Sequence, residues 1–120
     1  MQDFRKLIVW QRAQETCVQV YVFTADFPPV ERYGVTSQLR RAAVSVGANL
    51  AEGSKRTSPT DKARIFNIAQ SEAAEAISVL DLVERLNYGR SGEARRLGKI
   101  YDELLAMIES LRQHVLSTSQ

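Results

Sequence analysis

The sequence predicts an all-α protein, an antiparallel up-down four-helix bundle formed by a single domain over residues 1–120. Four segments rich in Ala, Leu, Gln, Glu and Arg carry apolar residues at the 3.6-residue period of a helix. Gly and Pro separate these segments by short loops, and no segment alternates apolar and polar residues as a strand does. Helices are therefore expected at residues 7–26, 36–53, 59–87 and 92–116.

The first helix, residues 7–26, has a single apolar stripe. Its members recur at the helical period: Trp10, Ala13, Cys17, Val20, Thr24 and Phe27. The stripe ends at Pro28-Pro29, which cannot continue a helix because proline lacks the backbone N–H and clashes with the preceding turn. One face of this helix is expected to lie against the bundle core.

The second helix, residues 36–53, is rich in small residues. Thr36 or Ser37 is expected to cap its start, and Gly53 is expected to end it in a left-handed conformation. Small side chains let another helix approach closely, and such packing would offset the low helix propensity of Gly47, where the helix could also bend.

The third helix, residues 59–87, has a strong start signal. Ser58 can cap it, Pro59 fits its first turn, and Asp61 complements the helix dipole. Two apolar rows follow: Phe66, Ala69, Ala73, Ile77 and Leu80 in one, and Ile65, Ile68, Glu72, Val79 and Leu86 in the other. A face this wide predicts contacts with more than one neighbour.

The fourth helix, residues 92–116, is expected to be capped by Ser91 and carries Glu93 in its first turn. Its apolar residues alternate at spacings of four and three: Leu97, Tyr101, Leu104, Ile108, Leu111 and Val115. This is the seam of helices that pack at a shallow angle, as in antiparallel bundles.

Composition excludes several classes of protein. Cys17 has no second cysteine for a disulfide, and one His with one Cys cannot supply the usual ligands of a zinc site. No apolar run approaches the ~20 residues of a membrane span, and the N-terminus lacks the apolar core of a signal peptide. We expect a cytoplasmic protein in a reducing compartment, neither exported nor bound in a membrane, with no metal or cofactor.

The side chains that could support catalysis are few, so no enzyme is expected. His114 lies near the end of the last helix, where a cation is favourable without any catalytic role. Cys17 lies on an apolar stripe with no histidine near in sequence to activate it. Glu52, Glu72 and Glu75 do not form the Glu-x-x-His pairs that di-iron bundles use.

These three glutamates have a more ordinary role as ion-pair partners. Arg40 and Arg41 stand among small residues on the second helix, where close packing is expected. A buried unpaired charge costs several kcal/mol, on the order of 3–5. We therefore expect at least one pair between these arginines and Glu52, Glu72 or Glu75, within a subunit or across an interface.

The strongest charge imbalance lies between residues 32 and 64, a segment that contains seven basic residues and two acidic ones. The seven are candidates for binding nucleic acid: Arg32, Arg40, Arg41, Lys55, Arg56, Lys62 and Arg64. Lys55 and Arg56, ahead of a helix N-terminus with Ser58 nearby, could hold a phosphate, although a solvated loop that aids solubility is the simpler alternative. No aromatic residues are interleaved with these cations as in single-strand binding platforms, which predicts backbone-led, weakly sequence-specific binding.

Several stretches of the chain resemble one particular family. They are Leu7-Ile8-Val9-Trp10-Gln11-Arg12-Ala13, Phe27-Pro28-Pro29, Glu31-Arg32-Tyr33-Gly34, Thr36-Ser37-Gln38-Leu39-Arg40-Arg41-Ala42-Ala43-Val44-Ser45-Val46 and Asn49-Leu50-Ala51-Glu52-Gly53. Over residues 7–64 the chain closely resembles the four-helix-bundle proteins encoded in intervening sequences of bacterial 23S ribosomal RNA genes. Two positions depart from that family, because many relatives have Pro in place of Gly47 and an aromatic residue in place of Lys62.

The resemblance implies a small bundle that assembles into a ring-shaped homopentamer with no known catalytic activity. The family also looks distantly similar to the accessory variability proteins of diversity-generating retroelements, which form basic pentameric barrels that bind nucleic acid and a reverse transcriptase. Two functions therefore stay open at this point. One is a non-enzymatic ring that binds RNA or DNA, and the other is a ring that acts as a protein-interaction scaffold with a protein partner.

Overall fold

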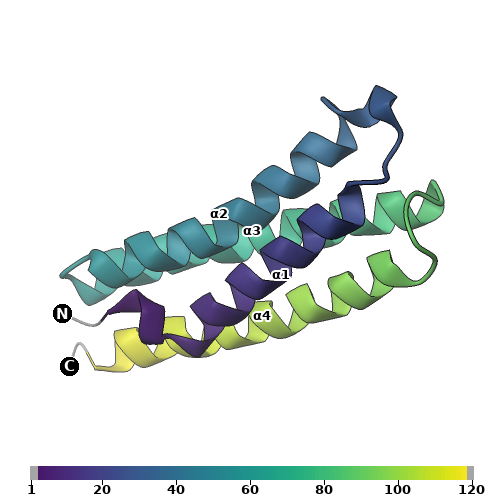
Figure 1. Cartoon of the computed structure of the whole chain (residues 1–120). Coiled ribbons are helices and arrows are strands. Elements are labelled where there is room, and N and C mark those ends of the chain that lie inside the picture. The colour runs from purple at the N-terminus through teal and green to yellow at the C-terminus, as the bar shows by residue number, and fades with distance from the viewer. Residues whose placement is uncertain (1–2, 119–120) are drawn as a thin grey trace.

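The structure is a computed structural model that describes residues 3–118, and it confirms the all-α four-helix bundle. The helices are α1 (Ile8–Thr24), α2 (Val35–Lys55), α3 (Pro59–Arg85) and α4 (Glu93–Ser117), and they run antiparallel in sequence order (Figure 1). Two short 3-10 turns that the sequence did not predict, η1 (Phe4–Lys6) and η2 (Pro29–Glu31), precede α1 and α2. The ends of α1 and α3 fall two residues before those predicted.

Helices that follow one another in the chain are neighbours in space, and α4 closes the bundle against α1. The contacts of α3 with α2 and α4 are the most extensive in the molecule. The bundle is elongated, 50 × 20 × 20 Å. At one end of it, η2 and the start of α2 rise away from α3 and α4 (Figure 1).

The core consists of the apolar stripes that the periodicity predicts. On α4, Leu97, Tyr101, Leu104 and Ile108 are buried, while Leu111 and Val115 at the far end of the seam are half-buried. The largest fully buried side chains of the other helices include Phe66, Leu39, Leu50 and Leu80. Each fully buried side chain of this size contributes about 1.5–3 kcal/mol, so the seam accounts for a large share of the folding free energy.

The start of α3 confirms the predicted cap, because the Oγ of Ser58 accepts a hydrogen bond from the backbone N–H of Asp61 at 3.0 Å. The two apolar rows of this helix are mostly used inside the bundle. Val79 and Ile65 of the second row are buried, whereas Ile68 and Leu86 are exposed. The exposed members leave some apolar surface on α3 and just after it for contact with another molecule.

The predicted caps of α2 and α4 are wrong. Neither Thr36 nor Ser37 caps α2, which begins directly after Gly34 without a side-chain cap. Ser91 does not cap α4, because the residue before that helix is Gly92, whose φ of +83° lies in the left-handed region that glycine favours. At α4 this glycine allows the chain to turn sharply into the first helical residue.

The predicted end of α2 at Gly53 is also wrong. The helix continues through Gly47 and Gly53 to Lys55. Gly53 is buried, and a Cβ placed on it would lie 2.6 Å from the ring of Phe66 on α3. The position lacks a side chain because the Phe66 ring occupies that space, and not because the backbone must turn there.

The Tyr101 hydroxyl is a weak point of the core. Its ring is fully buried, and the oxygen has no hydrogen-bond partner within residues 3–118. Burial, with a smaller contribution from Cys17, raises the pKa of Tyr101 above its ordinary value. The hydroxyl therefore stays protonated and unsatisfied.

Replacing Tyr101 by Phe is expected to raise the free energy of unfolding by about 1 kcal/mol, because an unsatisfied buried hydroxyl costs about 1–3 kcal/mol. Urea denaturation of both proteins at one concentration measures the difference. Tyr88→Phe is the matched control, since it removes a hydroxyl that donates to Oε2 of Glu31 at 2.9 Å and should lower stability. A loss of stability in Tyr101→Phe would mean that the hydroxyl is satisfied in solution.

Candidate nucleic-acid interface

The seven cations predicted to bind nucleic acid fall into two groups at opposite ends of α2. Arg40 and Arg41 lie in its first half, with Arg32 just before it, and Lys55 is its last residue. At 1.5 Å per residue, Arg41 and Lys55 are about 21 Å apart along the helix axis. The sequence run of positive charge is therefore two separate surfaces in the folded subunit.

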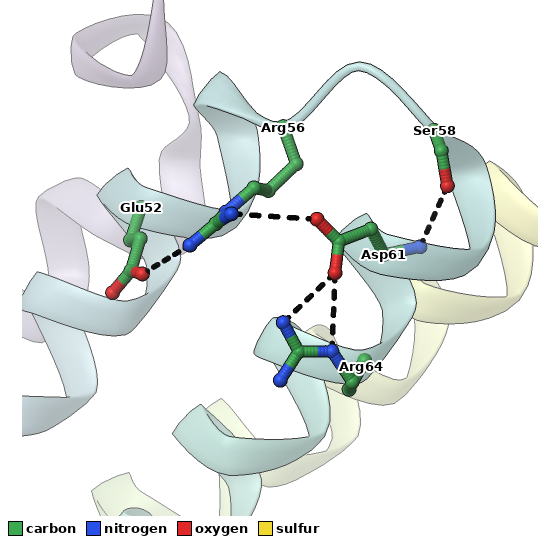
Figure 2. A network of polar contacts seen from close by, with 5 residues as sticks. All are labelled: Glu52, Arg56, Ser58, Asp61 and Arg64. Carbon is green, nitrogen blue, oxygen red and sulfur yellow. Dashed lines mark hydrogen bonds and ion pairs between the residues drawn. The ribbon is translucent and has the colours of Figure 1, made fainter.

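The two arginines at the α2–α3 turn are already paired with carboxylates (Figure 2). Arg56 contacts Glu52 at 2.7 Å and Asp61 at 3.5 Å, and Arg64 donates to Oδ1 of Asp61 at 3.0 and 2.8 Å. The hydrogen bond to Glu52 and the charge of Asp61 raise the pKa of Arg56. Two arginines and two carboxylates nearly cancel one another, so this turn offers a phosphate less attraction than its basic residues suggest.

Two other polar groups of this turn, on Lys62 and Ser58, are also engaged. Lys62 donates from Nζ to the backbone oxygen of Ser54 at 2.8 Å, and so satisfies a carbonyl near the end of α2. The Ser58 hydroxyl, predicted to help hold a phosphate, accepts from Asp61 instead. Lys55 lies 6.0 Å from the centre of the Phe4 ring and has no ion pair within residues 3–118. Both lysines of this group, Lys55 and Lys62, therefore have no carboxylate partner within residues 3–118.

At the other end of α2, Arg40 fastens α2 to α1. Its Nε donates to Oγ1 of Thr24 at 2.7 Å, its Nη2 donates to the backbone oxygen of Tyr21 at 3.4 Å, and its guanidinium lies 4.5 Å from the centre of the Tyr21 ring. Hydroxyl, carbonyl and aromatic ring satisfy this arginine without a carboxylate. The guanidinium is thus held in place and keeps its full positive charge.

The expected pairs of Arg40 and Arg41 with glutamates do not form inside the subunit. Arg41 is exposed and has no polar contact with residues 3–118. Glu52 binds Arg56 instead, and neither Glu72 nor Glu75 forms an ion pair within the same residues. A pair across a subunit interface stays a prediction.

A groove of about 610 Å³ opens where α1 and α2 meet η2. Its lining includes Arg32, Arg40 and Arg41 beside Tyr21 and Tyr33, and no lining residue is acidic. The nearby Glu31, which accepts hydrogen bonds from the Tyr88 hydroxyl and from the backbone N–H of Val35, is not among the lining residues. Three arginines thus line this hollow without a carboxylate, whereas two smaller hollows of the described chain both include Glu84 in their lining.

The two tyrosines are the functional candidates that the sequence interpretation missed. Tyr33 directly follows Arg32 within the basic stretch, so the signal was present in the sequence. Tyr21 lies on a different helix from Arg40, and only the antiparallel packing of α1 on α2 joins them. Aromatic rings do accompany the cations, contrary to the prediction, although they come from two separate segments.

The groups considered for catalysis lie away from this groove. Cys17 is half-buried on α1, and burial raises the pKa of its thiol, which keeps it protonated and a poor nucleophile. His114 is exposed on the last turns of α4. In the described part of the chain, no three His, Cys, Asp or Glu side chains come together as a metal site would need, and no helix is both long and apolar enough to cross a membrane.

Fold and site together define a small helical bundle with an apolar core and a surface groove lined by three arginines. The chain belongs to the family of 23S rRNA-intervening sequence proteins, whose model matches residues 5–110. A solved structure with the same fold is a protein of unknown function from the S23 ribosomal protein family of Bacteroides thetaiotaomicron. It superposes with a TM-score of 0.78 at 24% identity, over 88% of this chain and 98% of the other. No curated protein matches the chain in sequence.

Proposed function

We propose that this protein is a non-enzymatic homo-oligomer, a pentamer by its resemblance to its family, that binds RNA or DNA through backbone phosphates. The observation that carries the proposal is the groove lined by Arg32, Arg40 and Arg41 without an acidic residue. Guanidinium groups bind phosphate oxygens strongly, because their planar N–H groups match the oxygen positions. Arg32 and Arg41 make no ion pair within residues 3–118, so their charges are available to a ligand.

Assembly strengthens this proposal. A single groove with three arginines would bind a polyanion weakly under physiological salt. Five copies on one ring would create a positive field strong enough to concentrate a nucleic acid, and the affinity would fall steeply with salt. The proposed activity is therefore a property of the oligomer more than of the subunit.

A protein-docking scaffold is the second candidate, and exposed apolar side chains favour it. Val18 and Val22 on α1 and Val30 in η2 are largely in solvent. Exposed apolar patches of this kind mark contacts with other proteins or with copies of the same chain. Gel-shift titration of the wild-type oligomer with structured RNA, single-stranded DNA and duplex DNA at two salt concentrations separates the candidates. Salt-sensitive binding supports the nucleic-acid function. If nothing binds at low salt, the protein-docking scaffold is the candidate function that remains.

Paired substitutions locate the phosphate contacts. Arg32→Ala with Arg41→Ala removes two unpaired cations, and is expected to lower the slope of log affinity against log salt by about 1.4–1.8 in magnitude, or 0.7–0.9 per contact. Lys55→Ala with Arg56→Ala removes the same formal charge, but Arg56 is bound to Glu52 and Asp61. Its effect on the slope should be smaller. If the Lys55/Arg56 double substitution lowered the slope more than the Arg32/Arg41 double substitution, the phosphate contacts would lie at the α2–α3 turn.

A further inference from the structure

We infer that the groove between α1 and α2 selects single-stranded RNA or DNA, with unpaired bases stacked on Tyr33 and on the Tyr21–Arg40 wall. This inference rests on the proposed function and adds its ligand class. It also replaces the prediction of purely backbone-led binding, because the folded chain places aromatic rings among the cations. Proteins that bind single strands combine these two elements, a cationic groove for the backbone and aromatic faces for the bases.

Tyr33 provides the first stacking face. It follows η2, lines the groove, and is 89% exposed, which is the highest value among the large apolar side chains of the described chain. No ring contact or hydrogen bond holds this side chain within residues 3–118. An aromatic ring left in solvent at the edge of a positive groove gains apolar contact when a base covers it.

Tyr21 and Arg40 provide the second face, which is already rigid. The Arg40 guanidinium lies 4.5 Å from the ring centre and is fixed by the Thr24 hydroxyl and the Tyr21 carbonyl. Tyr21 is 43% exposed, so part of its ring stays open to the groove that it lines. Bases stack on both aromatic rings and guanidinium planes, and a wall held in advance loses little entropy when it binds them.

Phosphates would lie on the arginines that flank these faces. Arg32 precedes Tyr33 in the chain, and Arg41 follows Arg40 on α2. Ser37, one helical turn before Arg41, adds a hydroxyl to the same lining.

The concave shape argues against duplex as the ligand. Proteins that read duplex DNA insert a protruding helix or ribbon into its major groove. In addition, the base faces of a duplex are covered by stacking, so they are not accessible to an aromatic side chain. A hollow of about 610 Å³ can receive a protruding group, but it presents no element that could enter the groove of a duplex. An unstacked base on a flexible strand is such a group.

Fluorescence anisotropy with four labelled probes tests the inference at one low salt concentration. The probes are a dT 12-mer, a rU 12-mer, a DNA 12-mer of abasic sites, and a 12-base-pair duplex. The abasic strand keeps the phosphates and lacks the bases, so it isolates stacking. We expect the dT and rU strands to bind about tenfold more tightly than the abasic strand, and more tightly than the duplex. The ratio of dT to rU affinity distinguishes DNA from RNA as the preferred strand.

Tyr33→Leu, at a side chain too exposed to affect folding, should weaken dT binding about tenfold, and Tyr33→Phe should restore it. Leu82→Ala, an exposed apolar position on α3, is the matched control and should bind as wild type. Equal affinity for abasic and dT strands, or tighter binding of duplex, overturns the inference while the proposed function stands. Loss of the oligomer in Tyr33→Leu also overturns it, since the groove would then be a subunit interface. No binding of any probe refutes the proposed function itself.

Discussion

Replacing Gly53 by Ala is expected to lower the free energy of unfolding by about 1–3 kcal/mol, which is one of the largest effects of any single methyl group in this protein. The added Cβ would lie 2.6 and 2.8 Å from Cε1 and Cδ1 of Phe66. Both residues are buried, so neither the helix nor the ring can move without disturbing the core. The clash outweighs the gain in helix propensity, about 1 kcal/mol, that Ala brings.

Gly47→Ala, six residues earlier on the same helix, provides the matched control with the opposite sign. There the new Cβ would meet Oε1 of Gln14, the far end of an exposed and flexible side chain. Gln14 can rotate away, so the higher helix propensity of Ala should raise the free energy of unfolding by about 0.5–1 kcal/mol.

Thermal or urea denaturation of both variants at one protein concentration measures the pair, because oligomerisation makes stability depend on concentration. A 1–3 kcal/mol loss corresponds to a fall in Tm of about 4–12 °C for a chain of this length. If both glycines tolerate Ala equally, the contact between Gly53 and Phe66 does not limit how closely α2 and α3 pack.

These two glycines show a limit of structure prediction from local sequence patterns. Helix existence follows from periodicity, and the cap at Ser58 follows from local chemistry, so both were predicted. Gly53 also satisfies the local rule for a helix end, yet the Phe66 ring across the interface decides its role. A rule based on neighbouring residues cannot include a partner on another helix.

The candidate site also combines features that the sequence could predict with features that it could not. The seven cations could be found from charge alone, and the Asp61–Arg64 pair is a local i, i+3 contact that spacing could have predicted. The Tyr21–Arg40 wall could not, because it depends on how α1 crosses α2. The groove itself results from the divergence of η2 and the start of α2 from the rest of the bundle, which no periodicity encodes.

The proposed oligomer requires an apolar surface, and the structure changes where that surface is expected. The wide apolar face of α3 and the small-residue face of α2 are two candidates. Part of each is buried inside the subunit, although Ile68 and Leu86 of the second row stay exposed. The most exposed large apolar side chains of the four helices lie on α1, where Val18 is 64% and Val22 is 70% exposed, one helical turn apart on a single face. We therefore propose that a second copy covers this outer face of α1.

Such an interface is compatible with an open groove. Successive residues on an α-helix are rotated by about 100°, so Val22 faces a different direction from Tyr21, which lines the groove, whereas Val18 is rotated from Tyr21 by only about 60°. A subunit could use the outward face of α1 for assembly and the α2-facing side for ligand. The ring would then present one groove per subunit.

Val22→Glu is expected to convert the oligomer to monomers. In the separate subunit the glutamate would be solvated and would cost little, whereas in the interface each copy would bury an unpaired charge at a cost of several kcal/mol. Light scattering at micromolar concentration measures the change, and circular dichroism checks that the helices are retained. Leu82→Glu, the same type of change at a side chain 45% exposed on α3, should leave the assembly intact. A wild-type monomer at this concentration would refute the oligomer, and an oligomeric Val22→Glu variant would place its interface on another face.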